Sequence, residues 1–106
     1  MKLHIQLSDE FGSFCANGEK AAEFRFRTIE PYLQLHEEVV LDFQGIRNMN
    51  SSFANALIAP LVGNNPREVV GKLRFQNCTP VVRVLVESAI ALGMERSQFG
   101  TGCVPA

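Results

Sequence analysis

Five consecutive residues in the middle of the chain, Val39 to Phe43, constrain the fold most strongly. They read Val-Val-Leu-Asp-Phe, so large apolar side chains follow one another instead of alternating with polar ones. Such a run is typical of a strand that is buried on both faces, as the central strands of parallel sheets are. We therefore expect this segment to be a central strand in a sheet that packs against helices.

Strand and helix patterns alternate along the rest of the chain. Residues 2–8 and 72–76 alternate apolar and polar side chains, which predicts two further strands, and residues 11–15 can add a short one. Helix starts are indicated at Asn17-Gly18-Glu19, at Ser51 and at Thr79-Pro80. The βαβαβα order predicts an α/β fold with a mainly parallel or mixed central sheet and helices packed on it.

Three details of the helices follow from single residues. Pro31 should bend or end the first helix, and Pro60 should kink or stop the second near Ile58, because proline lacks an N–H and clashes with the carbonyl four residues back. Gly93 is expected to end the third helix. Its apolar spacing predicts a buried stripe formed by Val81, Val84, Leu85, Ser88, Ala89 and Leu92.

Length and charge limit the kinds of function that the chain can have. With 106 residues, of which 46% are hydrophobic, it fits one domain over 1–106, with a core at about 2–94 and a Gly-rich tail at 95–106. Ten Lys and Arg residues are mixed with eleven acidic ones, so no basic face for nucleic acid is expected. There is no run of about 20 apolar residues and no secretion signal, which predicts a cytoplasmic protein without a membrane span.

The residues that usually carry catalysis or bind metals form no recognisable set. Cys15, Cys78 and Cys103 are odd in number and widely spaced, so neither a disulfide framework nor a metal site is expected. The chain has two histidines and no Gly-rich phosphate loop, which predicts no enzyme and no cofactor. A reactive Cys15 in a flexible loop is the one enzymatic alternative. Arg25 and Arg27 are expected to extend over the surface.

No charged residue occurs from Asn48 to Pro66. One face of the helix in this segment carries only small, uncharged side chains, which lets another backbone approach closely and matches the depletion of charge at interface centres. Alternatively, another element of the same chain covers this face. We expect a protein-docking surface formed by Asn48, Asn50, Ser51, Ser52, Asn55, Ala56 and Ala59.

The order and spacing of these motifs resemble the STAS fold of anti-sigma factor antagonists. Asp42 closes an apolar strand, and Asn50-Ser51-Ser52 begins eight residues later, where antagonists carry Asp-Ser-Ser or Asp-Ser-Thr. Leu73-Arg74-Phe75 and the segment from Thr79-Pro80 to Gly93-Met94 are similar to the family's third strand and last helix. The match covers about residues 38–94 and is closest to uncharacterised small bacterial STAS-like proteins.

The resemblance implies a regulatory protein that binds a protein partner and is not a catalyst. In the antagonists, an ATP-binding anti-sigma-type serine kinase is the partner, and it phosphorylates the serine that follows the aspartate. The matching residue here is Ser51, with Ser52 as the second choice. Two departures affect this implication, because Asn50 replaces the aspartate and Phe53-Ala54 replaces Gly-Leu.

Several alternatives stay open at the level of sequence. Asn50 or Ser51 can simply cap the helix, a role that both residue types commonly have. Asp42 can orient the loop that carries Ser51, or it can only accept hydrogen bonds from a turn. The rival function is a self-associating structural module, in which the neutral helix and the tail form a homodimer and no phosphorylation switch exists.

Overall fold

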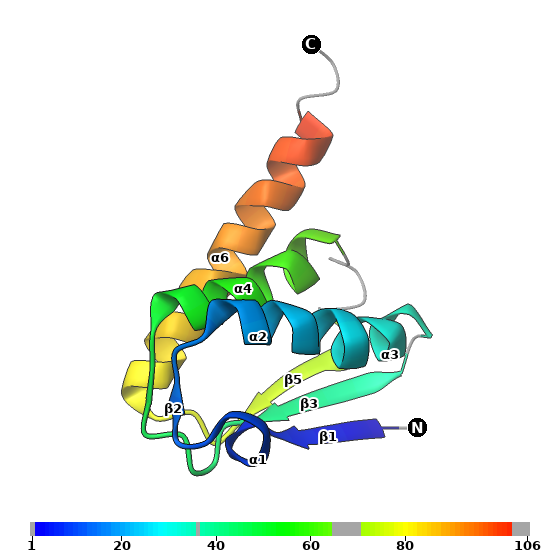
Figure 1. Cartoon of the computed structure of the whole chain (residues 1–106). Coiled ribbons are helices and arrows are strands. Elements are labelled where there is room, and N and C mark those ends of the chain that lie inside the picture. Colours follow the sequence, from blue (N-terminus) through cyan, green and yellow to red (C-terminus); the bar gives the residue numbers. More distant parts are fainter. Residues whose placement is uncertain (1, 36, 65–70, 103–106) are drawn as a thin grey trace.

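The computed structural model describes residues 2–35, 37–64 and 71–102, with side chains described up to Glu95 in the last helix. Strands and helices are interspersed along the chain (Figure 1). The elements are β1 (Lys2–Gln6), α1 (Leu7–Phe11), β2 (Phe14–Cys15), α2 (Gly18–Phe24), η1 (Arg25–Ile29), α3 (Glu30–Gln34), β3 (Glu38–Asp42), β4 (Asn48–Met49), α4 (Ser51–Asn64), β5 (Leu73–Gln76) and α6 (Pro80–Gly102).

The main sheet has three strands in the order β1-β3-β5, and both strand pairs are parallel. The apolar run therefore forms the central strand, as its sequence predicts. Gln6, Asp42 and Gln76 lie side by side at the carboxyl ends of the three strands. A second, smaller sheet pairs β2 with β4, also in parallel, which confirms the short extra strand expected within residues 11–15.

Helices α2, α3, α4 and α6 lie together on one side of the main sheet (Figure 1). Helix α4 is buried on most of its circumference, because α2 packs on one side of it and α6 on another. This position explains why its sequence carries no charge. The buried residues of α4 are Phe53, Ala54, Leu57, Ile58, Ala59, Leu61 and Val62. In the part of the chain that the structure describes, no helix has both the length and the apolar character needed to cross a membrane.

Polar side chains cover the face of the central strand β3 that points away from the helices. Val40 is buried, although its side chain lies on the face opposite Val39 and Leu41. Its neighbours in register are His4 and Arg74, which reach diagonally to Asp42 and Glu38 respectively, at 2.8 and 3.3 Å. Val40 therefore lies between the His4–Asp42 contact and the Arg74–Glu38 ion pair, which cover this face as the helices cover the first one.

Helix α4 continues through Pro60 to Asn64, so the stop expected near Ile58 is wrong. Proline has no N–H, and the carbonyl of Ala56 consequently lacks its usual donor in the helix. The Nε of Arg25 donates to this carbonyl at 3.0 Å. The expectation that Arg25 extends over the surface is also wrong, because its side chain is mostly buried and also pairs with Glu30. Arg27 is exposed, as expected, and pairs with Glu23.

The first helical region starts and changes where the sequence suggests. Asn17 caps α2 by accepting from the N–H of Lys20 at 3.1 Å. The interruption expected at Pro31 takes the form of a wider, π-helical turn over Arg25–Ile29, after which Pro31 lies in the first turn of α3.

Helix α6 differs from expectation at its end and in its buried face. It continues through Gly93 to Gly102, so most of the expected tail is helical, and residues 103–106 lie outside the described residues. Gly93 serves close packing, since a Cβ there would lie 2.5 Å from the carbonyl oxygen of Ala59. The expected buried stripe is only partly correct, because Ala89 is buried and Leu85 and Leu92 are half-buried, but Ser88 is exposed and Val82 and Val86 take the place of Val81 and Val84. Val82, Val86 and Ala89 are buried, whereas Val81 and Val84 are exposed.

Candidate docking site at the start of α4

Two helix starts lie beside each other at one end of the molecule. Strands β2 and β4 are paired, and each leads through an asparagine into a helix, β2 through Asn17 into α2 and β4 through Asn50 into α4. The helices approach closely at Gly18, where a Cβ would lie 3.2 Å from the carbonyl oxygen of Ser52. The absence of a side chain at Gly18 therefore allows the first turn of α2 to rest on the first turn of α4.

Asn50 makes three hydrogen bonds that cap α4 and tie its start to the segment before α2. Its Oδ1 accepts from the N–H of Phe53 at 2.8 Å, which is the usual N-cap bond. Its Nδ2 donates to the carbonyl of Ala16 at 3.1 Å, and its backbone N–H donates to the carbonyl of Cys15 at 3.0 Å. An aspartate could accept the first bond but could not donate the second. The asparagine is therefore suited to this site in a way that the antagonists' aspartate is not.

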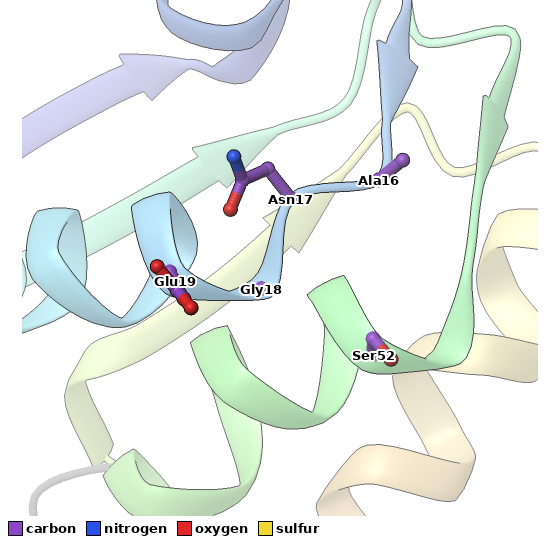
Figure 2. Close-up of a pocket in the computed structure, with 5 residues that line it drawn as sticks. All are labelled: Ala16, Asn17, Gly18, Glu19 and Ser52. Carbon is purple, nitrogen blue, oxygen red and sulfur yellow. The ribbon is translucent and has the colours of Figure 1, made fainter.

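Ser51 is the first residue of α4, and both Ser51 and Ser52 are exposed. Because Asn50 provides the cap, the helix does not use the hydroxyl of Ser51 for this purpose. Within the described residues that hydroxyl has no hydrogen-bond partner. Ser52 faces a shallow, open depression between the two helix starts, with Glu19 on the opposite rim (Figure 2). The depression is lined by Ala16, Asn17, Gly18, Glu19 and Ser52.

Part of the expected docking surface is covered by the chain itself. Ala59 is fully buried beneath α6, so its inclusion in that surface is wrong. Ala56 is half-buried, since α2 packs on it at Gly18 and Arg25 bonds its carbonyl. Asn55 is also half-buried. The exposed part of the expected surface is reduced to the beginning of the helix, namely Asn48, Asn50, Ser51 and Ser52.

Phe53, one of the departures from the antagonist pattern, points into the core. Its side chain is fully buried, and its ring meets that of Phe11 edge-on at a centroid distance of 4.9 Å. Phe11 in turn meets Phe24 at 5.4 Å, also edge-on. These three rings join α1, α2 and α4. The phenylalanine thus fixes the helix start in place and presents no surface to a partner.

Asp42 is buried at the end of the central strand and accepts three hydrogen bonds. Oδ1 accepts from the backbone N–H of Gln44 at 2.9 Å and from Nδ2 of Asn77 at 2.8 Å, and Oδ2 lies 2.8 Å from Nε2 of His4. The Asn77 bond contributes most to holding the pKa of this carboxyl below its ordinary value. Asp42 therefore fixes the beginning of the loop that leads to Ser51, and none of these bonds reaches Ser51 itself.

The cysteine environments do not fit a reactive loop thiol. Cys15 lies in β2 and is buried, so the flexible-loop placement is wrong. Burial raises the pKa of its thiol to about 11. Burial also raises the pKa of the Cys78 thiol, which is half-buried. Both thiols are therefore almost entirely protonated near neutral pH.

A parallel sheet with helices on one side, and an asparagine-capped helix start after its central strand, define a small STAS-like α/β domain. Residues 20–83 match the family described as a STAS-like domain of unknown function (DUF4325). The match spans more than half of the chain, which therefore belongs to this family, and it confirms the resemblance seen in the sequence motifs. No curated protein and no solved structure matches the chain.

The sequence interpretation missed the contribution of Ala16, Asn17 and Gly18. These residues line the depression beside Ser52, and the carbonyl of Ala16 holds the side chain of Asn50 in place. A weak signal was present in the sequence, since Asn17-Gly18 and Asn50-Ser51 are both asparagine-led helix starts. The two helix starts lie close together because β2 pairs with β4. Each of these strands has only two residues, which is too short for the sequence to predict that they pair.

Proposed function

We propose that this chain is a cytoplasmic, non-catalytic regulatory domain. It binds a protein partner through the start of α4, and phosphorylation of Ser51 releases that partner. The partner class that the STAS-like family suggests is an ATP-binding anti-sigma-type serine kinase. The proposal is supported by family membership, by the exposure of Asn48, Asn50, Ser51 and Ser52, and above all by the cap that Asn50 provides.

The cap matters because it assigns the structural role at the helix start to Asn50 and leaves the regulatory role to Ser51. Asn50 satisfies the N–H of Phe53, so a chemical change at the Ser51 hydroxyl removes no bond that the helix needs. A phosphate at this position would lie near the first N–H groups of α4 and the positive end of its dipole, which favour negative charge. The fold should therefore tolerate the phosphate, while about −1.5 to −2 units of charge appear on a neutral surface.

The two serines differ in what a phosphate would meet. Ser52 and Glu19 both line the depression, so a phosphate on Ser52 would share it with an acidic residue. Ser51 does not line this depression. Ser51 is therefore the preferred position and Ser52 the second choice.

The first experiment is to purify the protein from its native host under growth and stress conditions and to measure its intact mass. A mass increase of one phosphate, mapped to Ser51 by peptide fragmentation, is the expected result. Protein that stays unmodified under all conditions would contradict the switch. Phosphate on Ser52 alone would contradict the choice of serine.

The second experiment uses the partner recovered with the native protein. Ser51→Asp should weaken its binding by at least about tenfold, since an unpaired charge becomes buried in the interface. Ser51→Ala should bind like the wild type. Ser88→Asp is the matched control, because Ser88 is also an exposed serine but lies on α6, and it should also bind normally. Equal binding by the Ser51→Asp and Ser88→Asp variants would contradict the docking site.

A further inference from the structure

A second surface lies along the outer edge of the main sheet. Between β5 and α6 runs a groove of about 420 Å³. Val86 is buried in it, Phe75 and Ile90 are half-buried, and the exposed pair Arg83 and Glu87 forms its rim. The groove shares no residue with the site at Ser51.

The edge of β5 beside this groove presents backbone groups that β3 does not use. β5 is the last strand of the sheet and is paired only with β3 in the part of the chain that the structure describes. The carbonyl of Gln76 accepts from the N–H of Phe43, so the polar groups of Gln76 point towards β3. Because successive residues of a strand direct these groups to opposite edges, the N–H and C=O of Phe75 point outward. Such an edge is a template for another strand.

We infer that this edge is the dimer interface of the protein, and that its occupant is the β5 strand of a second copy. Two identical edges can pair only in antiparallel orientation around a two-fold axis, so that each contact occurs twice. The joined sheet would have six strands. This inference does not depend on the proposed function at Ser51.

Charge selects one register of this strand pair. Centring the pair on Arg74 would place two arginines directly opposite each other, which is unfavourable. Centring it on Phe75 lets the outward N–H and C=O of each Phe75 bond to those of the other copy, and it places Arg74 opposite Gln76. In this register the two Phe75 rings become neighbours on the helix side. The two rings extend an aromatic row that already contains Phe43, whose ring is stacked on that of Phe75 with 6.4 Å between the ring centroids.

The rim of the groove is complementary to itself under the same two-fold axis. Arg83 and Glu87 lie one turn apart on α6, with Nε and Oε2 3.4 Å apart, and both side chains are largely exposed. An antiparallel second α6 brings the Glu87 of one copy to the Arg83 of the other, and the reverse. Each side chain can therefore exchange an intramolecular partner for an intermolecular one. This charge complementarity favours a second copy over an unrelated peptide in the groove.

Charge reversal tests the arrangement. Arg83→Glu alone, or Glu87→Arg alone, should raise the dimer dissociation constant by at least about tenfold, because like charges then meet across the axis. The double variant Arg83→Glu/Glu87→Arg should restore it. Arg27→Glu is the matched control, since Arg27 and Glu23 form an equally exposed pair of the same spacing on the first helical region, and it should change nothing. The dissociation constants are measured by sedimentation velocity over a concentration series.

Several outcomes would overturn the inference. These are a wild-type monomer at all concentrations, a dimer that is indifferent to either single reversal, and a double variant that is not restored. Asn55→Arg separates this dimer from one formed through α4, because only the latter should dissociate. A direct measurement is amide hydrogen exchange, in which the N–H of Phe75 should exchange more slowly in the dimer than in the dilute monomer. Unchanged exchange at Phe75 would exclude the strand pair.

Discussion

The side-chain amide of Asn50 donates a hydrogen bond to the carbonyl oxygen of Ala16, across a separation of 34 residues in sequence and 3.1 Å in space. The same side chain caps α4, so one residue both begins a helix and ties it to the loop before α2. The bond explains why an asparagine stands where anti-sigma antagonists have an aspartate. It also fixes the position of Ser51 without using the serine.

Replacing Asn50 by aspartate should therefore be less conservative than it looks. The Asn50→Asp variant keeps the cap but loses the bond to Ala16, and we expect its free energy of unfolding to fall by about 1 kcal/mol. Asn50→Ala loses both bonds and should cost about 2 kcal/mol. Asn17→Asp is the control, because the described contact of the Asn17 side chain is only the cap that it accepts. Urea unfolding measures all three, and equal stabilities of Asn50→Asp and Asn17→Asp would refute the argument.

Arg25 and Pro60 should be energetically coupled. Arg25→Met removes the donor to the carbonyl of Ala56 and leaves Glu30 without this partner, so we expect a loss of about 2 kcal/mol. In a Pro60→Ala background the backbone N–H of residue 60 can bond that carbonyl, and the loss should shrink by about 1 kcal/mol. A double-mutant cycle by chemical denaturation measures the difference. Strict additivity would show that the arginine does not replace the missing proline donor.

Gly93→Ala should destabilise the packing of α6 on α4. The added Cβ would lie 2.5 Å from the carbonyl oxygen of Ala59 and 2.6 Å from Cβ of Val62, so the helices must separate. We expect a loss of about 1–3 kcal/mol, as for other overpacked cores. Gly71→Ala is the control, since no described residue lies within 4 Å of its added Cβ. A Gly93→Ala variant as stable as Gly71→Ala in thermal unfolding would contradict the close contact.

Asp42 should make the fold sensitive to acid. Its pKa is lowered in the folded state, mainly by the bond from Asn77, so the carboxylate stabilises the fold above its unfolded pKa of about 3.9. This contribution is lost as the pH falls through the lower, folded pKa. We expect Asp42→Asn to be less stable than the wild type at pH 7 and the difference to narrow below about pH 4. Urea unfolding from pH 7 to pH 3 checks this, and a constant difference would contradict the assigned pKa.

Cys15 should be unreactive in the folded protein. Its thiol is buried and its pKa is raised to about 11, so little thiolate is present or accessible at pH 7.5. Iodoacetamide labelling followed by peptide mapping should modify Cys15 at least about tenfold more slowly in buffer than in urea. Rapid labelling of the folded protein would reopen the thiol-enzyme alternative.

The elements that sequence predicted best are those with a local physical cause. The Asn17 cap, the Thr79-Pro80 helix start and the apolar strand ending at Asp42 are each specified by neighbouring residues, and the structure contains all three. Ser51 was likewise placed at a helix start. The expectations from sequence were wrong where a residue distant in sequence changes the structural effect of a proline or a glycine. Arg25 keeps α4 intact at Pro60, and the closeness of Ala59 gives Gly93 a packing role instead of a terminating one.

The choice of buried face on α6 shows the same limit. Val81 and Val82 are equally apolar, so the sequence cannot decide which of them points inward. The position of α4 decides it, because Val82, Val86 and Ala89 lie in the core while Val81 remains outside.

The sequence by itself determined the main βαβαβα order, although not α1 or β4, together with the central place of Val39–Asp42 and the membership in a STAS-like family, because hydrophobic periodicity, caps and motif spacing are properties of neighbouring residues. Only the tertiary structure decided that Asn50 both caps α4 and bonds to Ala16, that Ala59 is unavailable to a partner, and that β5 is paired only with β3 among the described residues. Each of these features depends on contacts between residues that are far apart in the sequence. Local sequence patterns do not show which distant residues meet.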